Sequence, residues 1–122
     1  MELPLPNIID RITILKLKIE RIGGNRFDAE MVAFQEALED FKKRGVKVDP
    51  HWVDNLYQIN MEEWDLLEKM NHEKKSGCDY SKIGKLYIET ELVNKRRSEA
   101  MNMIVEKTGS GFKEIKKNHP SE

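Results

Sequence analysis

Four acidic residues are spaced in a way that suits metal-dependent chemistry. Glu36-x-x-Glu39 is followed further along the chain by Glu62-x-x-Asp65, and the members of each pair lie about one helical turn apart. Carboxylates on facing helices supply the oxygen ligands that Mg²⁺ prefers, and the ion can stabilise the charge that develops on a phosphoryl group. The pattern therefore allows a magnesium-dependent hydrolase as one hypothesis.

This spacing resembles the E-x-x-E…E-x-x-D pattern of the all-α nucleoside triphosphate pyrophosphohydrolases. The resemblance implies a helical enzyme in which the four carboxylates hold Mg²⁺ against a triphosphate. The other interpretation is an ordinary solvated surface, because Glu36 lies opposite the apolar stripe of Phe34, Leu38 and Phe41. We prefer the solvated surface and keep the hydrolase as the alternative function.

Other catalytic and cofactor signals are missing from the sequence. His51, His72 and His119 are scattered, and there is neither a P-loop nor a G-x-G-x-x-G motif. We therefore expect no catalytic residues, no cofactor and no metal outside the magnesium alternative. The one cysteine, Cys78, cannot form a disulfide framework, which favours a reducing compartment, and we expect the cytoplasm.

The charge balance and the hydropathy pattern exclude two classes of partner. Lys and Arg number 21 against 22 Asp and Glu, giving a net charge of −1, so electrostatics give no reason to expect nucleic acid. No run of about 18 apolar residues occurs, so we expect no membrane span.

Polar residues interrupt the apolar columns of two predicted helices. Glu63 belongs to both columns of the helix expected at residues 50–75, and Asn60 belongs to one. Thr90 and Arg97 are shared by both columns of the following helix, and Asn94 belongs to one. Such residues are costly to bury unless they are paired, so we expect them to contact one another.

Two interpretations of these polar residues stay open. Folding back at the turn between the two helices would place Asn60 and Asn94 at one level, and Glu63 or Asp10 could pair with Arg97. The preferred interpretation is a buried network that fixes helix register. The other is a ligand pocket lined by the same residues.

Four amphipathic helices must position these side chains. N-cap, proline and glycine signals bound them at about 7–22, 27–44, 50–75 and 79–107, with Asn7, Asp49 and Asp79 as the expected N-caps. The tail at 108–122, with Phe112 and Ile115, is expected to form a docked turn. We therefore predict one helical domain over 1–122, an all-α, antiparallel four-helix bundle of two shorter and two longer helices.

The two ends of the chain resemble an uncharacterised bacterial and phage family of all-helical domains of unknown function. Residues 9–22, IDRITILKLKIERI, are similar to its I-D-[KR]-[IL]-[ST]-I-L…K-x-x-R-I opening. Asn94-x-x-Arg97 and residues 104–116 are similar to its N-x-x-R…I…G-S…E-x-K ending. Its central L-x-x-x-N-x-x-L-W helix resembles residues 56–64, with Glu63 in place of leucine. The resemblance implies a helical fold and hints at an accessory role beside surface-polysaccharide enzymes.

Our first functional hypothesis is a non-enzymatic, oligomeric helical module that binds a partner. The longer helices should project beyond the shorter pair, and a second copy of the chain is the simplest cover, so we predict a homo-oligomer, with a dimer favoured. A protein partner is the other expected occupant. The aromatic residues suited to anchor the contact are Trp52, Tyr57, Trp64 and Tyr87.

Overall fold

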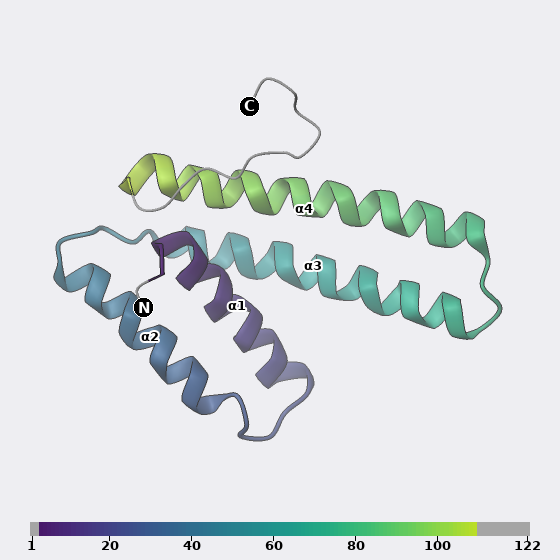
Figure 1. Ribbon diagram of the computed structural model, residues 1–122, viewed down its shortest axis with the longest axis horizontal. Helices are drawn as coiled ribbons and strands as arrows, with labels where there is room; N and C mark the ends of the chain where they lie inside the picture. The colour runs from purple at the N-terminus through teal and green to yellow at the C-terminus, as the bar shows by residue number, and fades with distance from the viewer. Residues whose placement is uncertain (1–2, 110–122) are drawn as a thin grey trace.

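The computed structural model describes residues 3–109, which form four α-helices (Figure 1). These are α1 (Leu5–Arg21), α2 (Asp28–Lys43), α3 (Pro50–Lys75) and α4 (Tyr80–Thr108). No strand occurs in this part of the chain, and the prediction of two shorter and two longer helices is confirmed. None of the four helices is long and apolar enough to cross a lipid bilayer. The turn expected at Phe112 and Ile115 lies outside the described residues.

The helix starts follow the predicted capping chemistry at two places and depart from it at one. The Asp49 side chain accepts a hydrogen bond from a backbone N–H at the start of α3, and Asp79 accepts two at the start of α4. The prediction of Asn7 as the first cap is wrong, because α1 begins at Leu5 with Pro4 at the N-cap position. Pro6 is tolerated there because a first-turn residue needs no intrahelical N–H donor.

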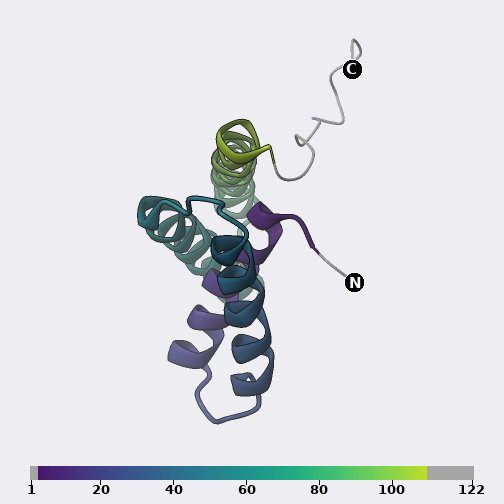
Figure 2. The same cartoon turned by 90° about the vertical axis from the view of Figure 1, so that its left-hand side faces the viewer.

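The four helices form two hairpins that lie at an angle to each other (Figure 1). The long hairpin is made of α3 and α4, and α1 packs against both of them. Among the described helices, the backbone of α2 approaches that of α1 alone, so α2 lies on the outside of the assembly (Figure 2). The centre of the fold is therefore a three-helix contact of α1, α3 and α4.

The hydrophobic core lies where these three helices meet. The largest fully buried side chains include Leu5, Ile9 and Leu15 from α1, Leu56 from α3 and Ile104 from α4. Helix α2 adds one buried residue, Phe41. Four further apolar residues of α2 are partly buried against the core, namely Met31, Phe34, Ala37 and Leu38. Burial of apolar surface at this junction is the main stabilising contribution.

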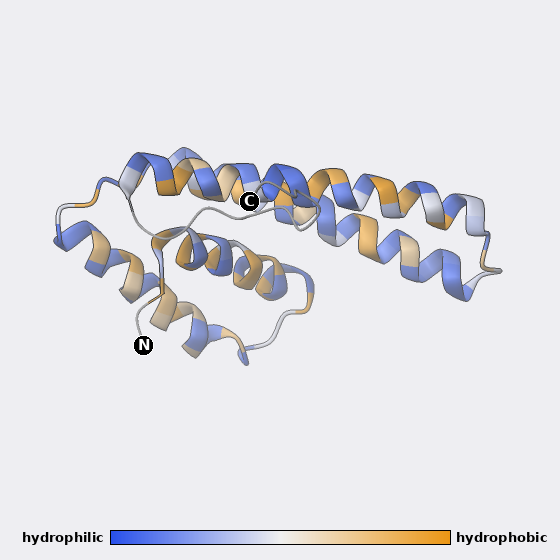
Figure 3. Ribbon diagram, turned by 45° about the horizontal axis from the view of Figure 1, so that its top comes forward, coloured by the Kyte–Doolittle hydropathy of each residue, from blue (hydrophilic) through white to orange (hydrophobic). Residues whose placement is uncertain are grey.

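Half of the long hairpin projects beyond α1 and α2 (Figure 1). We divide the hairpin into a base, residues 50–65 and 93–108, and an arm, residues 66–92. At about 1.5 Å per residue, the 26-residue α3 is about 39 Å long and the 17-residue α1 only about 25 Å. In the arm, burial is confined to Leu66 and Thr90, although apolar residues continue along both helices (Figure 3).

Candidate functional site

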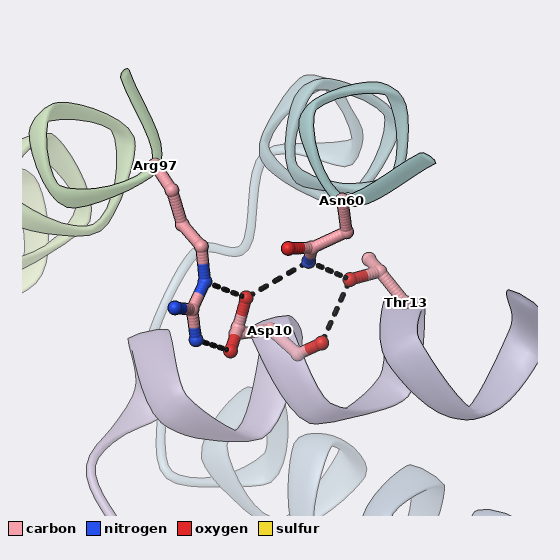
Figure 4. Close-up of polar contacts among 4 residues, drawn as sticks. All are labelled: Asp10, Thr13, Asn60 and Arg97. Carbon is pink, nitrogen blue, oxygen red and sulfur yellow. Dashed lines mark hydrogen bonds and ion pairs between the residues drawn. The ribbon is translucent and has the colours of Figure 1, made fainter. Parts of the chain in front are cut away.

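A polar cluster joins α1 to both long helices (Figure 4). Arg97 of α4 donates two hydrogen bonds to the Asp10 carboxylate of α1, from Nε to Oδ1 at 2.9 Å and from Nη2 to Oδ2 at 2.5 Å. Asn60 of α3 donates from Nδ2 to Asp10 Oδ1 at 2.9 Å and to Thr13 Oγ1 at 2.8 Å. Thr13 Oγ1 in turn donates to the main-chain oxygen of Asp10 at 2.7 Å. Three helices thus converge on one carboxylate.

The cluster is largely shielded from water. Asp10 is 6% exposed and Thr13 is fully buried, whereas the Arg97 side chain keeps 33% of its surface exposed. A two-pronged guanidinium–carboxylate contact and an amide donor offset the cost of burying the Asp10 charge. Within residues 3–109, every fully buried side-chain nitrogen or oxygen has a hydrogen-bond partner. The geometry is that of a satisfied network, in which the buried groups bond to one another.

Three of the six predicted polar residues lie outside this cluster. Glu63 is half-buried and makes no hydrogen bond or ion pair with any residue in 3–109. Thr90 is buried, but its hydroxyl donates to the main-chain oxygen of Leu86 in its own helix, at 2.8 Å. Asn94, expected at the same level as Asn60, is exposed, and the Asn60 amide bonds to Asp10 and Thr13 instead.

The position of Asn94 follows from which column of α4 faces inward. Val93, Ala100 and Ile104 are buried, whereas Tyr87 is exposed. Beside the polar cluster, the interior therefore takes the column through Val93 and Ala100. Asn94 belongs to the other column and is exposed, although Met101, seven residues later in that column, is buried.

Thr13 is the member of the cluster that sequence reasoning missed. It lies three residues after Asp10 and therefore on the same side of α1, next to apolar residues that are themselves buried. A hydroxyl at this spacing can bond back to the helix and still accept a hydrogen bond from outside it. A threonine three residues after Asp10 on a buried helical face therefore indicates a further polar residue of the cluster on α1.

A small cavity borders the cluster on the side of the arm. It has a volume of about 200 Å³, and its lining is formed by Ile14, Leu17, Asn60, Glu63, Trp64, Leu67 and Arg97. Ligand pockets usually hold about 300–1,000 Å³ and enclose most of the ligand. The cavity is below that range and mainly apolar, so the geometry favours the network over the pocket.

The four carboxylates of the magnesium hypothesis do not come together. Glu36 and Glu39 are exposed on α2, whose backbone does not approach α3. On α3, Glu62 accepts two hydrogen bonds from Arg96, at 3.0 and 2.9 Å, and Asp65 pairs with Arg21. Within residues 3–109 no group of three or more His, Cys, Asp or Glu side chains could hold one metal ion. The hydrolase alternative therefore lacks its predicted arrangement in the described part of the chain.

Surface contacts on α3 shift three pKa values, all away from neutrality. The hydrogen bond from Arg21 to Asp65 raises the pKa of that arginine, and the hydrogen bond to Glu62 does the same for Arg96. Tyr57 donates a hydrogen bond to the Glu20 carboxylate, which raises the pKa of the phenol. A general acid or base works best with a pKa near the working pH, so these shifts support positioning of α1 and α4 rather than proton transfer.

The proposed aromatic anchors have different environments. Trp52 is buried in the core, and Tyr57 and Trp64 are half-buried, the latter donating to Glu68 at 2.6 Å. Tyr87 is 57% exposed on the arm. Two further exposed apolar residues of the arm, Ile88 and Leu92, belong to neither predicted column of α4 and were missed.

Comparison with known proteins gives no match: no family model, no curated protein and no solved structure is significantly similar to the chain. The class that the structure defines is thus an all-α helical bundle with a buried polar cluster and a projecting arm. The resemblance to the uncharacterised helical family stays a prediction from the sequence.

Proposed function

We propose that the protein is a non-enzymatic helical binding module whose arm docks a partner, and that the first occupant is a second copy of the chain. The observation that carries this proposal is the continuation of the α1-binding faces into the arm. Residues seven apart lie on one side of a helix. Asn60 contacts α1, and Leu67 follows it on the same side of α3. Arg97 contacts α1, and Thr90 and Ile83 precede it on the same side of α4.

In the arm, Leu67 on this face of α3 is exposed, whereas on α4 Thr90 is buried and Ile83 is half-buried. We term the surface formed by Leu67, Ile83 and Tyr87 the arm face. Leu67 is 43% exposed, whereas Asn60, seven residues before it in the base, is 6% exposed and bonds to α1. On α4, Tyr87 is 57% exposed. At the base, α1 covers this face, and in the arm the face continues without a covering helix from the described residues. An exposed apolar face of this kind is suited to bind another helix.

The polar cluster supports this function indirectly. It fixes α1 at the base through Asp10, and the last residue of α1, Arg21, pairs with Asp65 just before the arm begins. Helix α1 therefore ends where the arm starts and cannot fold over the arm face. We infer that the cluster is structural and that its role is to hold the base rigid while the arm remains available.

A second copy is the simplest occupant because it has the same uncovered face. Two arms packed face to face would bury α3 and α4 from both chains in a four-helix arrangement, and a two-fold axis closes such a dimer. The free thiol of Cys78 on the arm is compatible with a reducing compartment, and we propose the cytoplasm.

The test is the mass of the protein in solution across a wide concentration range. We expect sedimentation equilibrium to show an average mass that rises with concentration for the wild type, and a lower average mass at each concentration for Leu67→Glu. Val32→Glu is the matched control, because Val32 is 51% exposed on α2, away from the arm. A wild type that stays monomeric at every concentration would contradict self-association, and equal effects of the two substitutions would contradict the arm face as its location.

A further inference from the structure

A second apolar surface lies on the opposite side of α4 from the arm face. Ile88 and Leu92 are one helical turn apart, and they are 59% and 58% exposed. Ile88 is nine residues from Arg97, about two and a half turns, so it lies on the side of α4 opposite the contact with α1. Met103, 38% exposed, lies three turns beyond Leu92 on the same side. We term this surface the outer stripe.

The charges beside the outer stripe are arranged symmetrically about Leu92. Glu89 is three residues before it and Lys95 three residues after it. Lys85 is seven residues before it and Glu99 seven residues after it. All four side chains belong to exposed residues, and none forms an ion pair with another residue in 3–109. At three and at seven residues from Leu92, an acidic residue on one side therefore matches a basic residue on the other.

We propose that two copies of the chain pair through the outer stripe, with their α4 helices antiparallel about a two-fold axis at Leu92. In this register Leu92 packs on the partner's Leu92, and Glu89 lies opposite the partner's Lys95. Lys85 lies opposite the partner's Glu99. Two-fold symmetry repeats both pairings, which gives four contacts between opposite charges around the Leu92 pair. The same register sets Ile88 against the partner's Arg96, whose guanidinium bonds to Glu62 within its own chain.

The same charges disfavour the alternative antiparallel register, in which the two-fold axis lies midway between Ile88 and Leu92. That axis would bring the two apolar residues together across the interface, but it would place Lys85 opposite the partner's Lys95. It would also place Glu89 opposite the partner's Glu91. Like charges at close range disfavour an interface, so the charge pattern selects the register centred on Leu92.

The contact is expected to be weak and sensitive to salt. One helix packed on one helix buries less surface than a standard protein interface, and exposed ion pairs are screened by dissolved ions. The outer stripe and the arm face lie on opposite sides of α4, so both can be occupied at once. Two separate two-fold contacts on one chain would join copies beyond a dimer.

Disulfide trapping tests the register directly. The full-length chain carrying Cys78→Gly is the background, because it removes the native thiol, and Leu92→Cys is added to it. Under mild oxidation we expect a disulfide-linked dimer to form at least about tenfold faster than with Lys82→Cys. Lys82 is also exposed on the arm, but it lies ten residues from the axis. Equal rates for the two variants would overturn the proposal.

Charge reversal provides a second test that does not depend on cysteine. Glu89→Lys and Lys95→Glu should each slow trapping through Leu92→Cys several-fold, because each places like charges opposite each other. Combining them should restore the rate, since the double variant only exchanges the two signs. A double variant as slow as the single variants would overturn the assigned register.

Leu67→Glu separates this proposal from the arm-face proposal. Trapping at Leu92→Cys should persist when the arm face is disrupted. Association that Leu67→Glu abolishes, without any preferential trapping at Leu92→Cys, would leave the arm face intact as a proposal and overturn the outer stripe. Preferential trapping at Leu92→Cys that Leu67→Glu does not change would support the outer stripe independently of the arm face.

Discussion

The base and the arm are built from the same two helices and differ in what covers them. In the base, α1 lies against both α3 and α4, and residues such as Leu56, Ile59 and Ile104 are buried. In the arm, the face of α3 that carries Asn60 continues with Leu67, which is exposed. The repeating pattern of apolar residues is thus similar in both regions, but only the base has a third helix to complete its core.

The difference also extends to the polar residues on these faces. In the base, Asp10 connects Asn60 and Arg97 across three helices. In the arm, Thr90 occupies the position one heptad before Arg97 and bonds only within its own helix. A polar residue on an inward-facing column becomes part of a network only where a third helix brings it a partner.

The largest expected difference concerns two leucines of α3. Leu56→Ala in the base should lower the free energy of unfolding by about 2–5 kcal/mol, because it leaves a cavity in a fully buried site. Leu67→Ala in the arm should cost less than about 1 kcal/mol, since the side chain is already largely exposed. Denaturant titration of both variants at low protein concentration measures the two costs. Similar losses would show that the arm is covered as well as the base.

The two adjacent arginines of α4 give the next comparison. Arg97→Ala should cost about 3 kcal/mol, because it leaves the buried Asp10 carboxylate without its cation. Arg96→Ala is the matched control and should cost less than about 1 kcal/mol, since its pair with Glu62 is exposed. Chemical denaturation compares the two. An Arg97→Ala chain of unchanged stability that had lost a binding activity would favour the pocket over the network.

Two threonines test the contrast at the level of a single hydroxyl group. Thr13→Val should lower the free energy of unfolding by about 1–2 kcal/mol, because Asn60 loses a buried acceptor. Thr90→Val removes a hydroxyl that bonds only within its own helix, so its effect should stay within about 0.5 kcal/mol. Thermal unfolding of both variants provides the measurement. A larger cost at Thr90 would place an unrecognised contact in the arm.

The smallest expected effect lies at the tip of the arm. Cys78 has a φ of 55°, a left-handed conformation that costs energy for any residue with a side chain. Cys78→Gly should therefore stabilise the turn by up to about 1 kcal/mol. Hydrogen exchange at the first turn of α4 would detect slower local opening. Faster exchange would mean that the cysteine side chain contributes contacts that outweigh its backbone strain.

Residue types in the sequence predicted part of the polar cluster. Asp10, Asn60 and Arg97 were expected to pair because they interrupt apolar columns, and the structure brings these three together. Glu63 and Asn94 satisfied the same criterion and lie outside the cluster. A helical column spans a range of directions, and a shift of one residue turns a side chain through about 100°. The sequence therefore left two possible interiors for α4.

The sequence by itself determined the four helices, because capping, glycine and proline signals are local and the apolar period is strong. Asp49 and Asp79 begin α3 and α4 as predicted, and Gly109 ends α4 in a left-handed conformation. Only the tertiary structure decided that α1 is shared by both long helices while α2 lies outside. It also decided that α1 ends at the start of the arm, that Thr13 joins the cluster, and that Ile88 and Leu92 face outward. These features depend on the angle between the hairpins, which is set by side chains far apart in the sequence.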